Sequence, residues 1–168
     1  MKLIVISSPT SLPNEHQIIE SLFENGLEVF DLHKPDYSKV QTEDFFKKIP
    51  LKYSDRVILH SQIPSFHSLE EIDEYKADYN YAYLSPVFDS ISKKGYRSNF
   101  DLKALRSSLE HLKCNLLALG GIDEDKIKIA RELGFAGVAV LGAIWQSKSP
   151  IEKFQRIKEK CEKKDLVF

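Results

Sequence analysis

One stretch of the chain, residues 115–144, most constrains what the chain can fold into. It holds two short runs, 115–119 and 137–141, that are apolar at nearly every position and are each followed by glycine. Such runs are typical of strands buried on both faces of a parallel sheet. Between them Asp123 can cap a helix over 124–133, and Gly134 can close it. The stretch therefore predicts a strand–helix–strand unit with glycine turns at the carboxyl end of the sheet.

These turns suggest an anion site. Gly120 and Gly121 permit positive φ and let a ligand approach bare backbone N–H groups. In (β/α) barrels a phosphate site is frequently built from the loops after the last two strands, which is where Gly120, Gly121 and Gly142 would lie. The alternative is that the glycines serve tight turns and bind nothing.

Composition excludes several classes of protein. The 168 residues are 42% hydrophobic and 29% charged, which suits one globular domain over 1–168. A net charge of −1 gives no electrostatic case for nucleic acid or an anionic membrane as partner. The apolar start, residues 3–6, is too short for a signal peptide or a membrane span, so we expect a cytoplasmic protein. Cys114 and Cys161 are isolated and read as packing residues.

The rest of the chain alternates strand and helix patterns and predicts an α/β fold with a parallel sheet. Six strands are expected, at residues 2–6, 27–32, 56–60, 79–84, 115–119 and 137–141. Eight β/α units would leave only about 21 residues each, fewer than typical barrels use. The sequence therefore predicts a TIM-type (β/α) barrel that is incomplete, with one or two units missing after the third strand.

The break lies at Ser61–His67. Seven residues are too few for a parallel crossover, so they form either a strand extension or a long loop. If a unit is missing, the third strand should neighbour 79–84 directly and the sheet should stay open. An open edge predicts self-association or an unstable monomer.

Polar residues just past each strand are the candidates for chemistry. They are Ser7, Ser8, His33, Lys34, His60, His67, Ser85, Ser90, Ser92, Lys93, Gly120, Gly121 and Gly142. Histidine suits proton transfer near neutrality. The alternative is that each histidine is only half-buried or exposed and has no catalytic role.

The loop 85–96 is longer than an ordinary turn, and long ordered loops are usually functional. Lys93 can hold a phosphate or pyrophosphate as a point charge, and the hydroxyls of Ser90 and Ser92 can donate hydrogen bonds to it. The alternative is that Lys93 and Lys94 are a solvated surface pair.

Four segments together resemble the thiamine phosphate synthase and TenI family of (β/α) barrels. They are LHKP at 32–35, SFHS at 65–68, YAYLSPVFDSISKKGY at 81–96, and the pair LLALGGI and GVAVLGAIW near the end. The resemblance implies a phosphate site on Gly120, Gly121 and Gly142, a pyrophosphate contact from Lys93, and proton shuttling by His67 as in thiazole tautomerases.

Two departures from the family pattern bear on activity. His33 stands where the family's basic loop has arginine. Lys34, the next residue, is expected to be a further ligand contact. The family's synthases join a pyrimidine pyrophosphate to a thiazole phosphate with Mg²⁺, but the acidic residues expected to hold Mg²⁺ have no counterpart here, and a hard cation needs such oxygens.

The first hypothesis is therefore an enzyme of thiamine biosynthesis in which His67 or His33 moves a proton on a thiazole phosphate or thiamine phosphate-like ligand. It would be a transferase of the synthase type or a tautomerase-like isomerase. The alternative is a catalytically degenerate phosphate-ligand binder or partner protein of the same fold.

Overall fold

The computed structural model describes residues 1–75, 78–89, 91, 98, 100–112 and 114–163. Within these residues the strands are β1 (Lys2–Ile6), β2 (Val29–Leu32), β3 (Val57–Leu59), β4 (Ser65–Phe66), β5 (Tyr81–Leu84), β6 (Asn115–Ala118) and β7 (Gly137–Val140). The helices are α1 (Glu15–Glu24), α2 (Lys39–Lys47), α3 (Leu69–Glu74), α4 (Leu102–Leu109), α5 (Ile127–Leu133), α6 (Gly142–Trp145) and α7 (Pro150–Glu162), with 3₁₀ turns η1 (Leu51–Arg56) and η2 (His60–Gln62).

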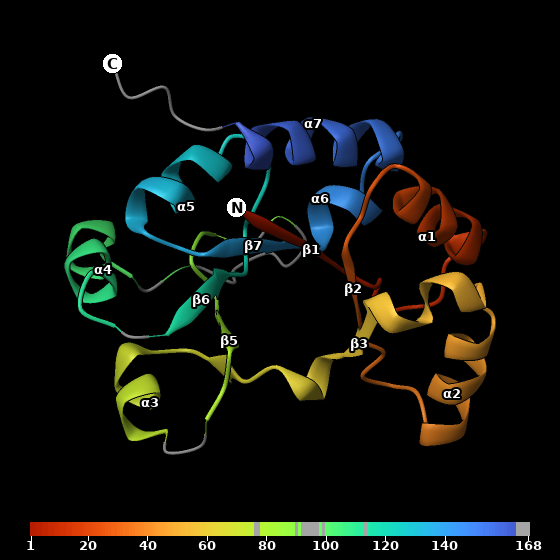
Figure 1. The fold of residues 1–168 in the computed structure, drawn as a ribbon, viewed down its shortest axis with the longest axis horizontal. Coiled ribbons are helices and arrows are strands. Elements are labelled where there is room, and N and C mark those ends of the chain that lie inside the picture. The colour runs from red at the N-terminus through yellow and green to blue at the C-terminus, as the bar shows by residue number, and fades with distance from the viewer. Residues whose placement is uncertain (76–77, 90, 92–97, 99, 113, 164–168) are drawn as a thin grey trace.

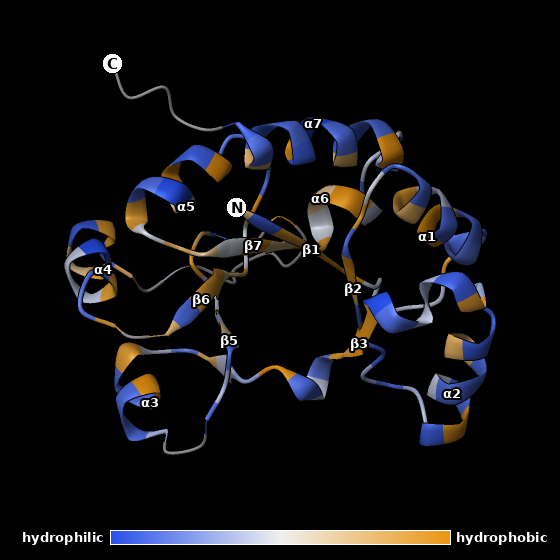
Figure 2. Ribbon diagram, viewed as in Figure 1, coloured by the Kyte–Doolittle hydropathy of each residue, from blue (hydrophilic) through white to orange (hydrophobic). Residues whose placement is uncertain are grey.

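The strands form one parallel sheet in the order β3-β2-β1-β7-β6-β5-β4. The sheet curls, and the larger helices lie around its outside, with their blue hydrophilic faces outward in Figure 2 (Figures 1 and 2). This is the incomplete (β/α) barrel that the alternating pattern predicts. In the described part of the chain no helix is both long and apolar enough to cross a membrane.

The sequence analysis predicts that the third strand neighbours residues 79–84, and this prediction is wrong. β3 pairs with β2 only, and the residues that pair with β5 are Ser65 and Phe66, a short strand that the sequence patterns did not show. The chain runs from β3 through η2 to β4 without a crossover helix and passes along the open side of the sheet (Figure 1). Residues 57–66 therefore form two short strands joined by a 3₁₀ turn, and the two strands lie at opposite edges of the sheet.

The core has two layers because side chains of a strand alternate between its faces. The larger cluster lies between sheet and helices, and the smaller one fills the inside of the curl with Ile4, Ile6, Tyr83, Leu117 and Ala139. Leu84 and Val140 belong to the helix-facing cluster, whereas Leu119 packs on the inner one.

One helix start differs from the sequence expectation. The helix expected from residue 124 begins at Ile127, after a turn closed by the Lys126 N–H on the Asp123 carbonyl. Ser38 caps α2 with a capping box to Gln41, and the short helix α6 begins two residues after the end of β7.

Both cysteines pack against the larger cluster, and Cys161 on α7 is buried. Burial raises the pKa of the Cys161 thiol to about 11. At pH 8 only about one such thiol in a thousand is a thiolate, the form that reacts. We expect a Cys114→Ser variant to react with Ellman's reagent only after denaturant is added. Rapid labelling of the folded variant would contradict the described packing.

Candidate active site

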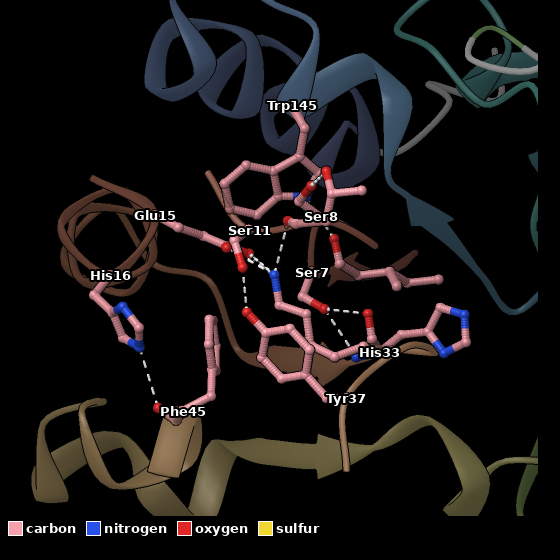
Figure 3. A network of polar contacts seen from close by, with 12 residues as sticks. Ser7, Ser8, Ser11, Glu15, His16, His33, Tyr37, Phe45 and Trp145 are labelled. Atoms are coloured by element: carbon pink, nitrogen blue, oxygen red, sulfur yellow. Dashed lines mark hydrogen bonds and ion pairs between the residues drawn. The ribbon is translucent and has the colours of Figure 1, made fainter. Parts of the chain in front are cut away.

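The loops after β1 and β2 are tied together by one serine. The Ser7 hydroxyl donates to the His33 carbonyl (2.9 Å) and accepts from the His33 N–H (2.8 Å), as Figure 3 shows. The Ser7 N–H also donates to the Asp31 carbonyl at 2.8 Å. Ser7 is fully buried, so these bonds fix where the backbone of His33 leaves the sheet.

The structure brings two of the sequence-predicted histidines together. His33 follows β2 and His60 follows β3, and their ring centroids lie 4.2 Å apart at 46°. β2 and β3 are neighbours in the sheet, so their carboxyl ends deliver both rings to the same place.

Lys34 is not directed to this place. Its ammonium, which has three donors, donates to both carboxylate oxygens of Glu15 at 2.7 Å and to the Thr10 carbonyl at 3.0 Å. Both side chains are buried, and Glu15 lies on α1 (Figure 3). Lys34 thus anchors α1 to the loop after β2, and a direct phosphate contact from it stays a prediction.

His67 stands at the carboxyl end of β4 and is exposed. Its Nδ1 lies 2.8 Å from the Ser85 carbonyl, which can only accept, so Nδ1 carries a proton. The Glu71 carboxylate accepts the His67 N–H at 2.6 Å, and Ser68 caps α3. The Ser85 carbonyl thus holds the ring and Glu71 of α3 holds the backbone of His67, and the neutral imidazole offers Nε2 as a base.

The predicted glycine turns after β6 have a packing reason. Gly120 and Gly121 have φ of +90° and +66°, and a Cβ on Gly121 would overlap the Asp89 carbonyl. The Val87 and Phe88 N–H groups donate to the carbonyls of Leu119 and Gly120, respectively, so the loop after β5 lies on this turn. These contacts are compatible with an anion on the remaining backbone N–H groups, but they also explain the glycines without one.

Gly142 is the first residue of α6 and directly follows the loop end of β7. β7 pairs with β6, so the turns after both strands lie at the same end of the sheet. A short extra helix beside the last strands is a frequent part of phosphate sites in (β/α) barrels.

Ser90, Ser92 and Lys93, the candidates in the loop after β5, lie outside the described residues. Their predicted contacts to phosphate or pyrophosphate therefore stay predictions.

The described residues do not fit Mg²⁺. No three His, Cys, Asp or Glu side chains among them gather as cation ligands. The buried carboxylate of Asp31, on β2, is bonded to His60 and Tyr83 instead. Mg²⁺ is usually bound through carboxylates and phosphates with near-octahedral geometry, and this part of the chain offers no such oxygen set.

Sequence reasoning missed Asp31 and Tyr83 as site residues. Both lie within strands, whereas the candidates were chosen from the residues just past each strand. The available signal was the single charged residue in the buried strand 29–32, at an alternate position from Phe30 and Leu32. Such a residue points away from the helices and into the curl.

The arrangement defines a class of protein: an incomplete (β/α) barrel whose histidines and glycine turns collect at the carboxyl ends of its strands. Comparison with known proteins is consistent with this. Residues 64–144 match a family model described as thiamine monophosphate synthase. This range includes His67, Gly120, Gly121 and Gly142 but not His33 or Lys34.

Individual relatives agree. A thiamine-phosphate synthase from Prochlorococcus marinus is 35% identical over 62% of this chain and 31% of its own length, and one from Salinibacter ruber is 29% identical over 53% and 39%. A solved thiamine phosphate pyrophosphorylase from Bacteroides thetaiotaomicron superposes with a TM-score of 0.80 at 28% identity and covers 95% of this chain and 97% of its own. The chain is therefore similar to the thiamine phosphate synthase/TenI family, and it spans less than half the length of these two curated relatives.

Proposed function

We propose that this chain binds a phosphorylated heterocycle of the thiazole phosphate or thiamine phosphate class and moves a proton on it, as a tautomerase-like enzyme of thiamine biosynthesis. The observation that carries the proposal is the orientation of His67, whose Nδ1–H is held by the Ser85 carbonyl so that Nε2 is the basic nitrogen. The family match over residues 64–144 supports the substrate class.

The chemistry needs only this chain's own residues. His67 Nε2 takes a proton from the ligand ring, and the Ser85 carbonyl stabilises the imidazolium that forms, because it accepts from Nδ1–H. Proton transfer is favoured over the synthase reaction because the described carboxylates do not form a Mg²⁺ site. A positioned general base contributes about 10²–10⁴-fold to rate.

The ligand phosphate is proposed to lie at the turns after β6 and β7, on backbone N–H groups of Gly121 and Gly142. The two turns are adjacent because β6 and β7 pair. Lys93, Ser90 and Ser92 would contact the same ligand from the loop after β5. Lys34 would contact the phosphate only if its ion pair with Glu15 opens, and with the pair closed it would hold α1 in place.

Titration calorimetry tests this binding. We expect thiazole phosphate and thiamine phosphate to bind, and the unphosphorylated thiazole alcohol to bind at least tenfold more weakly, because hydrogen bonds to a charged group contribute roughly 1.5–3 kcal/mol each. Absence of heat with both phosphates at millimolar concentration would refute the proposal. Binding without turnover, unchanged in His67→Ala, would instead select a degenerate ligand-binding protein.

The variant Gly142→Ala tests the proposed phosphate site without a large change in the stability of the fold. Gly142 has no positive φ, unlike Gly120 and Gly121, so an added methyl should leave the midpoint of urea denaturation nearly unchanged. We expect the affinity for thiazole phosphate to fall about tenfold, since the methyl crowds the approach to the first N–H groups of α6. Unchanged affinity would place the phosphate elsewhere.

Self-association through the open side of the sheet also remains a prediction. The apolar groove between α2 and β3, lined in part by Phe46, Val57 and Leu59, supports it, because Leu59 is 40% exposed there. Light scattering of the full chain at micromolar concentration measures it, and a strictly monomeric mass would refute it. A cytoplasmic location likewise stays an expectation from the sequence.

A further inference from the structure

A buried carboxylate inside the curled sheet indicates a second site of proton transfer. Asp31 on β2 is fully buried, and its Oδ2 accepts hydrogen bonds from the Tyr83 hydroxyl and from His60 Nδ1, each at 2.7 Å. Its Oδ1 has no hydrogen-bond partner among the described residues. Leaving a buried polar atom unpaired costs roughly 1–3 kcal/mol, so this carboxylate calls for a reason beyond stability.

Tyr83 on β5 holds the carboxylate from the opposite side of the curl. Burial, followed by the charge of Asp31 and the hydrogen bond to it, raises the pKa of the Tyr83 phenol far above its ordinary value. The hydroxyl therefore stays protonated and donates to Asp31. The Tyr83 ring also stacks on the His60 ring, with centroids 5.5 Å apart and planes at 15°. One tyrosine thus positions both the carboxylate and the imidazole.

His60 is the member of this group that a ligand can reach. It directly follows β3, its side chain is 24% exposed, and its ring lies beside that of His33. With Nδ1 bonded to Asp31, the nitrogen that remains for a ligand is Nε2. A carboxylate behind histidine selects the Nδ1–H tautomer and stabilises the imidazolium that forms when Nε2 takes up a proton. Because Oδ1 has no partner among the described residues, it does not share the negative charge of Asp31 with another donor, and that charge can stabilise the His60 imidazolium.

We propose that His60 is a second proton-transfer residue, acting through Nε2, and that Asp31 and Tyr83 are its positioning residues. For its ligand this inference rests on the proposed function. In the step, a C–H bond of the bound heterocycle breaks, its electron pair stays in the ring, and the proton forms an N–H bond at His67 Nε2. His60 Nε2 gives a proton to another ring atom, and the two histidines then exchange one proton with solvent, so nothing is consumed. Tautomerisation needs an acceptor and a donor, and His60 and His67 are two candidate histidines at the strand ends whose Nδ1 is bonded to an acceptor.

The tautomer is measured on the ligand-free full chain by NMR of ¹⁵N-labelled histidine side chains, with the His60 signals identified by their loss in His60→Gln. We expect Nδ1 of His60 to carry a proton donated to Asp31. A His60 protonated on Nε2 alone would overturn the proposal, whether or not the protein binds thiazole phosphate. This measurement keeps the dyad testable if the proposed ligand proves wrong.

The function of the dyad is measured as exchange of ring protons of thiazole phosphate with deuterated solvent. In His60→Ala we expect a loss of at least tenfold, partly restored by added imidazole, with affinity by calorimetry changed less than threefold. Tyr83→Phe keeps the stacked ring and removes only the hydroxyl, so we expect a smaller loss there. The exposed His111, bonded to Ser107 at the end of α4, is the control, and His111→Gln should behave as wild type. Full activity of His60→Ala, or a loss that imidazole does not restore, would refute the role.

Discussion

Lys34→Met should destabilise the protein by about 3–5 kcal/mol, because it leaves the Glu15 carboxylate buried without its cation. The side chains of Lys34 and Glu15 are 0% and 3% exposed, so water cannot replace the lost partner. Methionine is similar in length to lysine, so the lost packing is small. The unfolding free energy from urea denaturation measures the effect.

A second variant separates the ion pair from packing. Lys34→Met combined with Glu15→Leu removes both charges, and we expect it to recover most of the loss, since a buried ion pair replaced by apolar residues is often neutral. Lys128→Met is the matched control, because Lys128 and Glu132 form an exposed pair on α5 and such pairs contribute about 0–1 kcal/mol. If Lys34→Met is as stable as wild type but loses affinity for thiazole phosphate, Lys34 is a ligand contact and not an anchor of α1.

His67→Ala should lower the rate of proton exchange on thiazole phosphate by about 10²–10⁴-fold, the usual contribution of a positioned general base. The ring is exposed and not packed in the core, so the midpoint of urea denaturation should hardly change. Affinity for thiazole phosphate should also be kept, because the phosphate is proposed to lie at Gly121 and Gly142. The measurement is therefore turnover, calorimetry and denaturation on the same variant.

The supporting contact offers a finer version of this experiment. Glu71 accepts the His67 N–H, so Glu71→Gln keeps an acceptor oxygen and should retain most of the turnover. Glu71→Ala frees the backbone of His67 and should lose part of it. Wild-type turnover in His67→Ala would show that this residue is not the base, and the same measurement on His60→Ala would then test His60 in its place.

Local patterns in the sequence were enough to predict β6, β7 and the end of α5. Residues 115–119 and 137–141 are apolar on both faces, and Gly134 does close α5 in the left-handed region with φ of 99°. These features depend on neighbours within a few residues, so they can be predicted from short stretches of the sequence.

The pairing of the edges was decided by tertiary structure alone. The sequence shows that residues 61–67 are too short for a crossover, but not that Ser65 and Phe66 would pair with Tyr83 and Leu84. Strand pairing joins residues far apart in the chain, and two residues are too few for a periodic signal. The curl of the sheet brings β5 within reach of this segment.

The same distinction between local sequence and tertiary structure applies to the residues of the candidate site. The sequence by itself determined which residue types follow each strand, and so named His33, His67, Gly120, Gly121 and Gly142. Only the tertiary structure decided the partners: Asp31 from β2, Tyr83 from β5 and His60 after β3 meet inside the curl, while Lys34 turns away to Glu15. The physical reason is that hydrogen bonds between side chains from different strands depend on the register and curvature of the sheet, which no short stretch of the chain encodes.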